Sequence, residues 1–118
     1  MHTIVVIDDD ESNNRLLQTV LKDYQVLAAR NAEEGISLIR QVLPSLILMD
    51  IRMPGMGGMA AIQLIRNDPE LAHTPIIAVT ATSPSEDVRD AIASGCDGYV
   101  AKPFKPTELR ALVHDFLG

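Results

Sequence analysis

Acidic, hydroxyl and amine side chains follow four separate apolar runs of this 118-residue chain. Asp8 and Asp9 come after TIVVI, Asp50 after LILM, Thr80 after IIAV, and Lys102 after YVA. In a parallel α/β sheet the carboxyl ends of all strands lie at one edge, so residues far apart in the sequence meet there. We therefore expect a single site that combines carboxylates, a hydroxyl and a fixed ammonium.

Three carboxylates crowded into one site repel one another when ionised, and Lys102 offsets one negative charge at most. A divalent cation would offset the rest, and ligands that are all oxygen favour Mg²⁺ or Mn²⁺ over zinc. We predict Asp9 and Asp50 as direct ligands, with Asp8 acting through a bound water. The backbone carbonyl of Arg52, just beyond Asp50, is the candidate for a further ligand.

A cation held by acids at such an edge favours phosphoryl chemistry. Asp50 is the candidate nucleophile, because a carboxylate can accept phosphate to form an aspartyl-phosphate. Lys102 would hold one phosphoryl oxygen as a compact point charge. Thr80 would donate its hydroxyl to another phosphoryl oxygen.

These residues need strands and helices to position them, and the hydrophobic pattern predicts both. Runs such as IVVI and LILM are apolar at every residue, as expected for strands that are covered on both faces. Strands are expected at Thr3–Ile7, Val26–Ala29, Leu46–Met49, Ile76–Val79 and Gly98–Ala101. Between and after the strands, five stretches carry helical spacing. The first is marked by Leu16, Leu17, Val20, Leu21 and Tyr24, the fourth by Val88, Ala91 and Ile92, and the fifth by Leu109, Leu112, Val113 and Phe116.

Helix boundaries carry their own signals. The stretches Asn31–Glu34 and Ser83–Glu86 have the pattern of capping boxes, and Pro106 suits the first turn of the last helix. Asp10 is expected only to cap the first helix. The segment Leu21–Leu27 is short for a join between a helix and a strand.

Five alternating strand and helix signals predict a (βα)₅ fold in one domain over residues 1–118. The fold class is α/β, a doubly wound, five-stranded parallel sheet. Its length favours the flavodoxin-like strand order 2-1-3-4-5, in which the ligand crevice lies between strands 1 and 3. Asp8, Asp9 and Asp50 follow those two strands.

Four stretches together resemble the receiver domain of two-component response regulators: VVIDDDESNNRLL, LILMDIRMPGMGG, IIAVTATS and GYVAKPF. They follow the family's order at about its spacing and cover nearly the whole chain. The resemblance implies that Asp50 is the phosphoacceptor, that Asp8 and Asp9 form the acidic pair, and that the domain binds Mg²⁺. It also implies a histidine kinase or histidine phosphotransfer protein as the phosphodonor in a phosphorelay.

The same resemblance implies further roles. Thr80 and Tyr99 are similar to the family's switch pair, and the Lys102-Pro103 step is similar to one whose peptide is usually cis at Pro103. A downstream protein is expected on the face made by the fourth helix, the fifth strand and the fifth helix. The chain departs from the family at Gly57, where Asp is frequent, so a looser loop is expected there.

Two other functions are consistent with parts of this pattern. Asp8-Asp9-Asp10 also resembles the Asp-x-Asp nucleophile of small Mg²⁺-dependent phosphohydrolases of the haloacid dehalogenase type, with Asp8 as nucleophile. That family needs a further acidic pair after the lysine, whereas only Glu108 and Asp115 follow Lys102. The hydrolase interpretation also assigns no clear role to Asp50. The other alternative is a binding module that is never phosphorylated.

Composition limits the remaining possibilities. The formal charge is −6 with no basic block, so nucleic-acid binding is not expected. Cys96 is the chain's one cysteine, which excludes an internal disulfide; we expect it to be a small buried filler in a reducing compartment. No apolar run reaches membrane-spanning length. These features predict a cytoplasmic protein without membrane contact.

Overall fold

Five parallel strands form one sheet in the order β2-β1-β3-β4-β5. The computed structural model describes residues 2–51, 57–80, 95–101 and 103–117. In chain order the elements are β1 (Thr3–Ile7), α1 (Glu11–Val20), β2 (Gln25–Ala29), α2 (Ala32–Val42), β3 (Leu46–Asp50), α3 (Gly58–Asn67), β4 (Ile76–Thr80), β5 (Gly98–Ala101) and α5 (Pro106–Leu117). The predicted fold class and strand order are confirmed. The predicted fourth helix lies outside the described residues.

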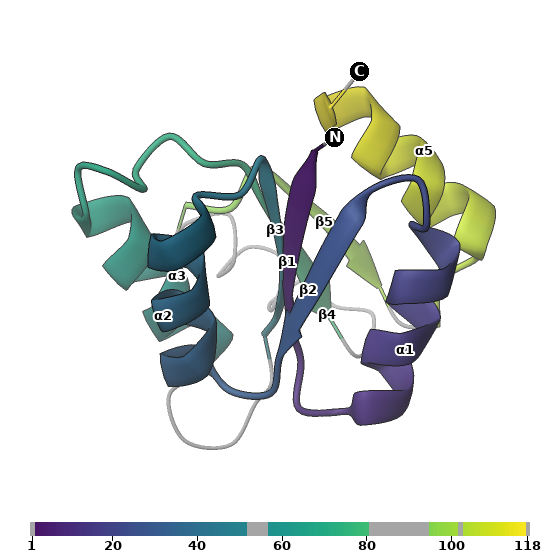
Figure 1. The fold of residues 1–118 in the computed structure, drawn as a ribbon, viewed down its shortest axis with the longest axis horizontal. Coiled ribbons are helices and arrows are strands. Elements are labelled where there is room, and N and C mark those ends of the chain that lie inside the picture. Colours follow the sequence, from purple (N-terminus) through teal and green to yellow (C-terminus); the bar gives the residue numbers. More distant parts are fainter. Residues whose placement is uncertain (1, 52–56, 81–94, 102, 118) are drawn as a thin grey trace.

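Helices cover the sheet on both faces, α1 and α5 on one side and α2 and α3 on the other (Figure 1). β1 shows why, since alternate residues of a strand point to opposite faces. Ile4 and Val6 pack into the core beneath α1 and α5, while Val5 and Ile7 pack into the core beneath α2 and α3. All four are at most 1% exposed. The all-apolar run is therefore explained by burial on both faces.

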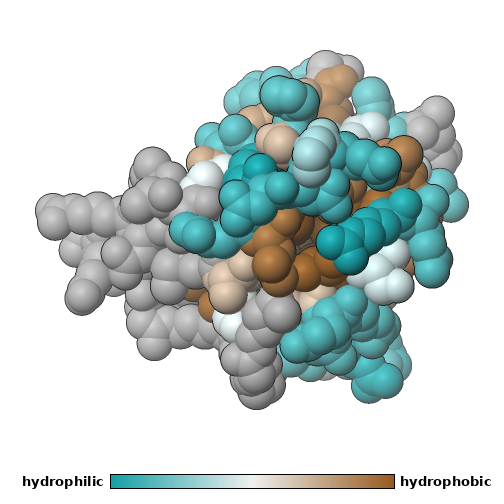
Figure 2. All heavy atoms as spheres, turned by 90° about the vertical axis from the view of Figure 1, so that its left-hand side faces the viewer, coloured by the Kyte–Doolittle hydropathy of each residue, from teal (hydrophilic) through white to brown (hydrophobic). Residues whose placement is uncertain are grey.

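On the α2–α3 side of the molecule, some apolar side chains remain exposed to water. Figure 2 shows apolar side chains between hydrophilic ones on this side of the molecule. Leu38 and Val42 of α2 are only partly buried against the core, and Leu64 is 46% exposed. These helices therefore cover the sheet and leave some apolar surface in contact with water.

Several predicted boundaries shift by one residue. β2 begins at Gln25, because its backbone continues the ladder with Thr3. β3 includes Asp50, which pairs with Val79, and β4 includes Thr80, which pairs with Ala101. Asp50 and Thr80 are therefore the last residues of their strands, whereas the sequence predicted that each comes just after its strand. The ladder holds their backbones in the sheet.

Among the described residues the helix starts agree with the predicted capping signals, and the predicted capping box Ser83–Glu86 lies outside them. The stripe predicted for the first helix is wrong at Leu16 and at Tyr24, which lies beyond the end of α1. Asp10 caps α1 through bonds from the Ser12 and Asn13 amides, and Asn31 caps α2. α5 begins at Pro106. Leu16 was wrongly placed in the buried stripe of the first helix, because it is 45% exposed. The helix ends at Val20, so the short segment that follows joins it to β2 by a turn.

Cys96 lies buried in the turn before β5, in agreement with its predicted role as a small filler. Burial raises the pKa of its thiol, and the nearby carboxylate of Asp97 adds to the effect. In the described part of the chain, every helix is too short or too polar to span a lipid bilayer.

Leu43 ends α2 in a left-handed conformation, with φ 48° and ψ 68°, and is 59% exposed. Most residues with a β-carbon are strained there by about 1 kcal/mol, whereas Gly has no β-carbon and the short polar side chain of Asn can hydrogen-bond to the nearby backbone. We expect Leu43→Asn to raise the free energy of unfolding by about 1 kcal/mol in urea titrations. Leu43→Ala is the control, because it removes the same exposed side chain and keeps the strain. Equal stabilities for both variants would contradict this explanation.

Candidate phosphoacceptor and metal site

The site is built where β1 and β3 end side by side. Ile7 pairs with Met49 across these two strands, so Asp8 and Asp50 follow at the same level of the sheet. Asp8 extends the β1 ladder by donating its backbone N–H to the Ala29 carbonyl over 3.0 Å. Neighbouring parallel strands thus bring residues 8 and 50 together, as expected at this edge.

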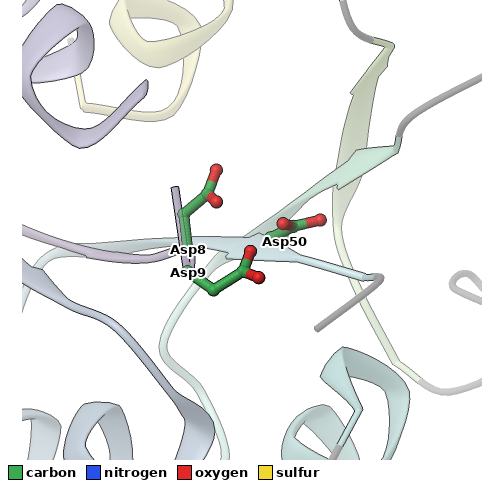
Figure 3. A group of neighbouring side chains, drawn as sticks. All are labelled: Asp8, Asp9 and Asp50. Atoms are coloured by element: carbon green, nitrogen blue, oxygen red, sulfur yellow. The ribbon is translucent and has the colours of Figure 1, made fainter. Parts of the chain in front are cut away.

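Three carboxylates gather at this point. Asp8, Asp9 and Asp50 each offer an oxygen, and these oxygens lie within 4.8 Å of one another. Figure 3 shows the side chains from the ends of β1 and β3 grouped around a common space. Asp8 is 2% exposed and Asp50 4% exposed, whereas Asp9 is exposed. The structure therefore brings together the three acids that the sequence predicts as a cluster.

The electrostatics of this group favour a bound cation. Two unit charges at about this separation repel by roughly 3 kcal/mol at an effective dielectric constant of about 20. A divalent cation held between these carboxylates would offset that repulsion, and an all-oxygen set fits Mg²⁺ or Mn²⁺. The arrangement of these residues is therefore compatible with a small divalent cation.

Hydrogen bonds fix Asp8. Its Oδ1 accepts from the Asp10 backbone N–H over 2.9 Å, and its Oδ2 accepts from Nδ2 of Asn13 over 2.5 Å. Its backbone carbonyl accepts from Nδ2 of Asn14 over 3.0 Å. Asn14 is itself buried. The start of α1 and its cap thus hold Asp8 through both its side chain and its backbone.

The other predicted site residues are only partly described. Thr80 ends β4, and its backbone pairs with Ala101 of β5. Tyr99, on β5, is 49% exposed. Pro103 is exposed, and the peptide bond that precedes it involves Lys102. Lys102 and Arg52 lie outside the described residues, as does the side chain of Thr80, so their predicted contacts with the site stay predictions.

Sequence reasoning missed three residues that shape the site. Asn13 and Asn14 bond to Asp8, although both lie in α1, where Asn is a poor helix former. Two such residues three and four positions after an acidic triplet were an available signal. Gly58 is the third, because a β-carbon on it would collide with the Asp50 carbonyl oxygen and lie 2.7 Å from the Ile51 Cα. The sequence shows only that it follows another glycine.

Comparison with known proteins agrees with this geometry. Residues 4–114 match the model of the response regulator receiver domain. The chain is 31% identical to the polar-differentiation response regulator DivK of Brucella anthropi, over 98% of this chain and 96% of DivK. It superposes on Vibrio cholerae chemotaxis protein CheY4 with a TM-score of 0.92 at 25% identity, covering 98% of each chain. A two-component response regulator from Clostridium difficile gives 0.92 at 29% identity, covering 99% of this chain and 96% of that one.

The chain belongs to the response regulator receiver family. Proteins of this family are phosphoacceptors in two-component signalling and are not classical enzymes, and they work with histidine kinases and downstream effectors. Receiver domains typically bind Mg²⁺, with which the acidic cluster is compatible. The family assignment supports phosphorelay signalling over the phosphohydrolase alternative with Asp8 as nucleophile.

Proposed function

We propose that this receiver accepts a phosphoryl group on Asp50 from the phosphohistidine of a histidine kinase or histidine phosphotransfer protein. The observation that carries the proposal is the convergence of Asp8, Asp9 and Asp50 within 4.8 Å at the ends of β1 and β3. Asp50 is the member of this set that ends the third strand, where the family's motif has its acceptor. One cysteine and an acidic composition support a cytoplasmic setting for this exchange.

In the proposed reaction, an oxygen of the Asp50 carboxylate attacks the phosphorus of the phosphohistidine. The phosphorus–nitrogen bond breaks, its electron pair returns to the donor imidazole, and Asp50 becomes an acyl phosphate. A bound Mg²⁺, or Mn²⁺ in its place, supplies positive charge to the phosphoryl oxygens. Water entering the same site would later hydrolyse the acyl phosphate, so the domain assists both its own phosphorylation and its dephosphorylation.

The remaining roles are assigned by motif and position. Asp9 and Asp50 would ligate the cation directly, Asp8 would act through a water, and the Arg52 carbonyl would add a ligand. The exposure of Asp9 supports its direct role, since it is the member of the cluster most accessible from solvent. Thr80 pairs with Ala101 of β5 and so ends its strand at the edge that carries the acids. Lys102 comes next in the sequence after Ala101. Each would bind one phosphoryl oxygen.

Signal output would follow from a change in packing near Thr80 and Tyr99. Their strands are neighbours, and Tyr99 pairs with Ala78, two residues before Thr80. Tyr99 is half-exposed here, so an inward turn of its ring, as the Thr80 hydroxyl moves toward a phosphoryl group, would change the exposed surface of β5. A partner that binds β5, α5 and the segment of the fourth helix would sense that change.

The proposal is tested by phosphorylation with a small donor. Incubation with acetyl phosphate and Mg²⁺ should add the mass of one phosphoryl group to the intact protein. Chelation of the cation with EDTA should prevent that addition, because the carboxylates of the site then repel the anionic phosphodonor without a divalent cation to offset their charge. An unchanged mass with Mg²⁺ present would contradict the proposal and favour a binding module that is never phosphorylated.

A further inference from the structure

Asn13, in the first turn of α1, has a side chain that bonds directly to a carboxylate of the acidic cluster. Its Nδ2 donates to Oδ2 of Asp8 over 2.5 Å, a part-buried bond between an amide and a carboxylate. Hydrogen bonds to a charged acceptor are shorter and stronger than neutral ones. Asn13 therefore makes one of the stronger contacts that Asp8 has with its own loop.

The position of Asn13 is itself fixed. It lies in the first turn of α1, and its backbone N–H donates to Oδ1 of the helix cap Asp10 over 3.4 Å. The Asp10 backbone N–H in turn donates to the second carboxylate oxygen of Asp8. The cap of the helix and the orientation of Asp8 thus form one connected set of bonds.

Asn14 supports the same arrangement from below the surface. It is 4% exposed, and its Nδ2 donates to the Asp8 carbonyl. Its Oδ1 is buried without a hydrogen-bond partner among the described residues. Burial of an unpaired amide oxygen costs free energy. This cost falls on Asn14, the residue whose side chain bonds to the Asp8 backbone.

Asp8 and Asp9 therefore differ in their exposure to solvent. Asp8 is buried, and each of its carboxylate oxygens accepts an N–H donor. Asp9 is exposed. A carboxylate held by two donors keeps one orientation, so it can present an oxygen to a cation or its water without losing side-chain freedom on binding. Outer hydrogen-bond partners of this kind commonly set metal affinity.

We propose that Asn13 is a positioning residue that orients Asp8 and thereby sets the affinity of the acidic cluster for a divalent cation. This inference rests on the proposed function of the same site. Asn13 would act through Asp8 alone and would make no contact with the phosphoryl group. Its removal should change the cation concentration at which the site fills and leave the chemistry of Asp50 intact.

The test is the binding of Mn²⁺ to the full chain, measured by the electron paramagnetic resonance signal of the free ion. We expect Asn13→Ala to weaken Mn²⁺ binding about tenfold or more. Asn13→Gln, which carries the same amide on a longer chain, should recover part of the loss. Ser12→Ala is the matched control, because Ser12 is exposed in the same helical turn, and its affinity should equal that of the parent.

A second readout separates positioning from a general loss of structure. The Mg²⁺ concentration that gives half the maximal rate of labelling by acetyl phosphate should rise by the same factor in Asn13→Ala. The rate at saturating Mg²⁺ should change much less. Asn13→Ala loses the bond to the buried Asp8 carboxylate and should be less stable than Ser12→Ala, so both variants are compared without urea, where circular dichroism should show each to be folded.

The outcomes distinguish this inference from the function on which it rests. If the parent protein binds Mn²⁺ and is phosphorylated, but Asn13→Ala matches it within twofold, the positioning role of Asn13 is wrong and the proposed function stands. If the parent itself neither binds Mn²⁺ nor gains a phosphoryl group, the proposed function is wrong and the inference falls with it.

Discussion

Asp50→Asn should gain no phosphoryl mass from acetyl phosphate and Mg²⁺ under conditions that label the parent protein fully. An amide cannot act as the nucleophile that a carboxylate provides, and it cannot form an acyl phosphate. Asn has nearly the same shape as Asp, so the variant should keep its fold in the 4% exposed position at the end of β3. Intact-mass spectrometry measures the labelling and circular dichroism the fold.

A matched control is available on α5. Asp115 is exposed near the end of α5, which lies beside the start of β1 and so at the opposite end of the sheet from the acidic cluster (Figure 1). Asp115→Asn therefore makes the same chemical change outside the site. It should be labelled as the parent is. Labelling of Asp50→Asn to the same extent would mean that another residue takes the phosphoryl group, and the assignment of Asp50 would be wrong.

Gly58→Ala should be the most damaging small substitution near the site. The added β-carbon would collide with the backbone carbonyl oxygen of Asp50 and lie 2.7 Å from the Ile51 Cα. Backbone atoms cannot rotate away as a side-chain end can, so α3 or the end of β3 must move. We expect a loss of about 3 kcal/mol in the free energy of unfolding, at the upper end of the range for overpacking. Urea denaturation measures it.

The displaced backbone belongs to the residue that carries the proposed acceptor. Gly58→Ala should therefore also slow labelling of Asp50 in the molecules that remain folded, because small displacements of a reacting group cost large factors in rate. The rate of mass gain below the unfolding transition measures this effect. Labelling at the parent's rate would show that the strain is absorbed by α3 alone.

Gly57→Ser is the control for this substitution. Gly57 is the N-cap of α3, and among the described residues a β-carbon there would meet the Ile51 carbonyl oxygen alone, at 3.9 Å. Ser is at least as good a helix cap as Gly, so the variant should gain a few tenths of a kcal/mol. A loss similar to that of Gly58→Ala would show that the loop, and not the close approach at Gly58, is sensitive to side chains.

Much of the fold follows from the sequence because burial on both faces leaves a strong pattern. Ile4 to Ile7 are apolar without interruption, and each of them packs into one of the two cores. The end of each strand is harder to predict. Asp50 and Thr80 are polar, and only their pairing with Val79 and Ala101 in the formed sheet makes them strand residues. The prediction that Leu16 is buried was wrong because the width of the buried face of a helix depends on how the helix packs against the sheet.

The acidic cluster was predictable because it depends only on strand order. Once β1 and β3 are neighbours, the residues that follow them must meet. The residues that orient the cluster were not predictable in the same way. The bond from Asn13 to Asp8 depends on where α1 begins, and the space around Gly58 depends on the path by which α3 returns to β3. Both are consequences of loop geometry that a hydrophobic pattern does not encode.

The central claim is that Asp50 carries the phosphoryl group, and the most direct measurement locates that group chemically. Borohydride reduction of the protein after phosphorylation converts an aspartyl-phosphate to homoserine, which peptide mass spectrometry can place in the sequence. The account predicts homoserine at position 50 alone. Homoserine at position 8 would contradict it and restore the hydrolase alternative, and its absence from a fully labelled sample would show that the phosphoryl group is not on a carboxylate.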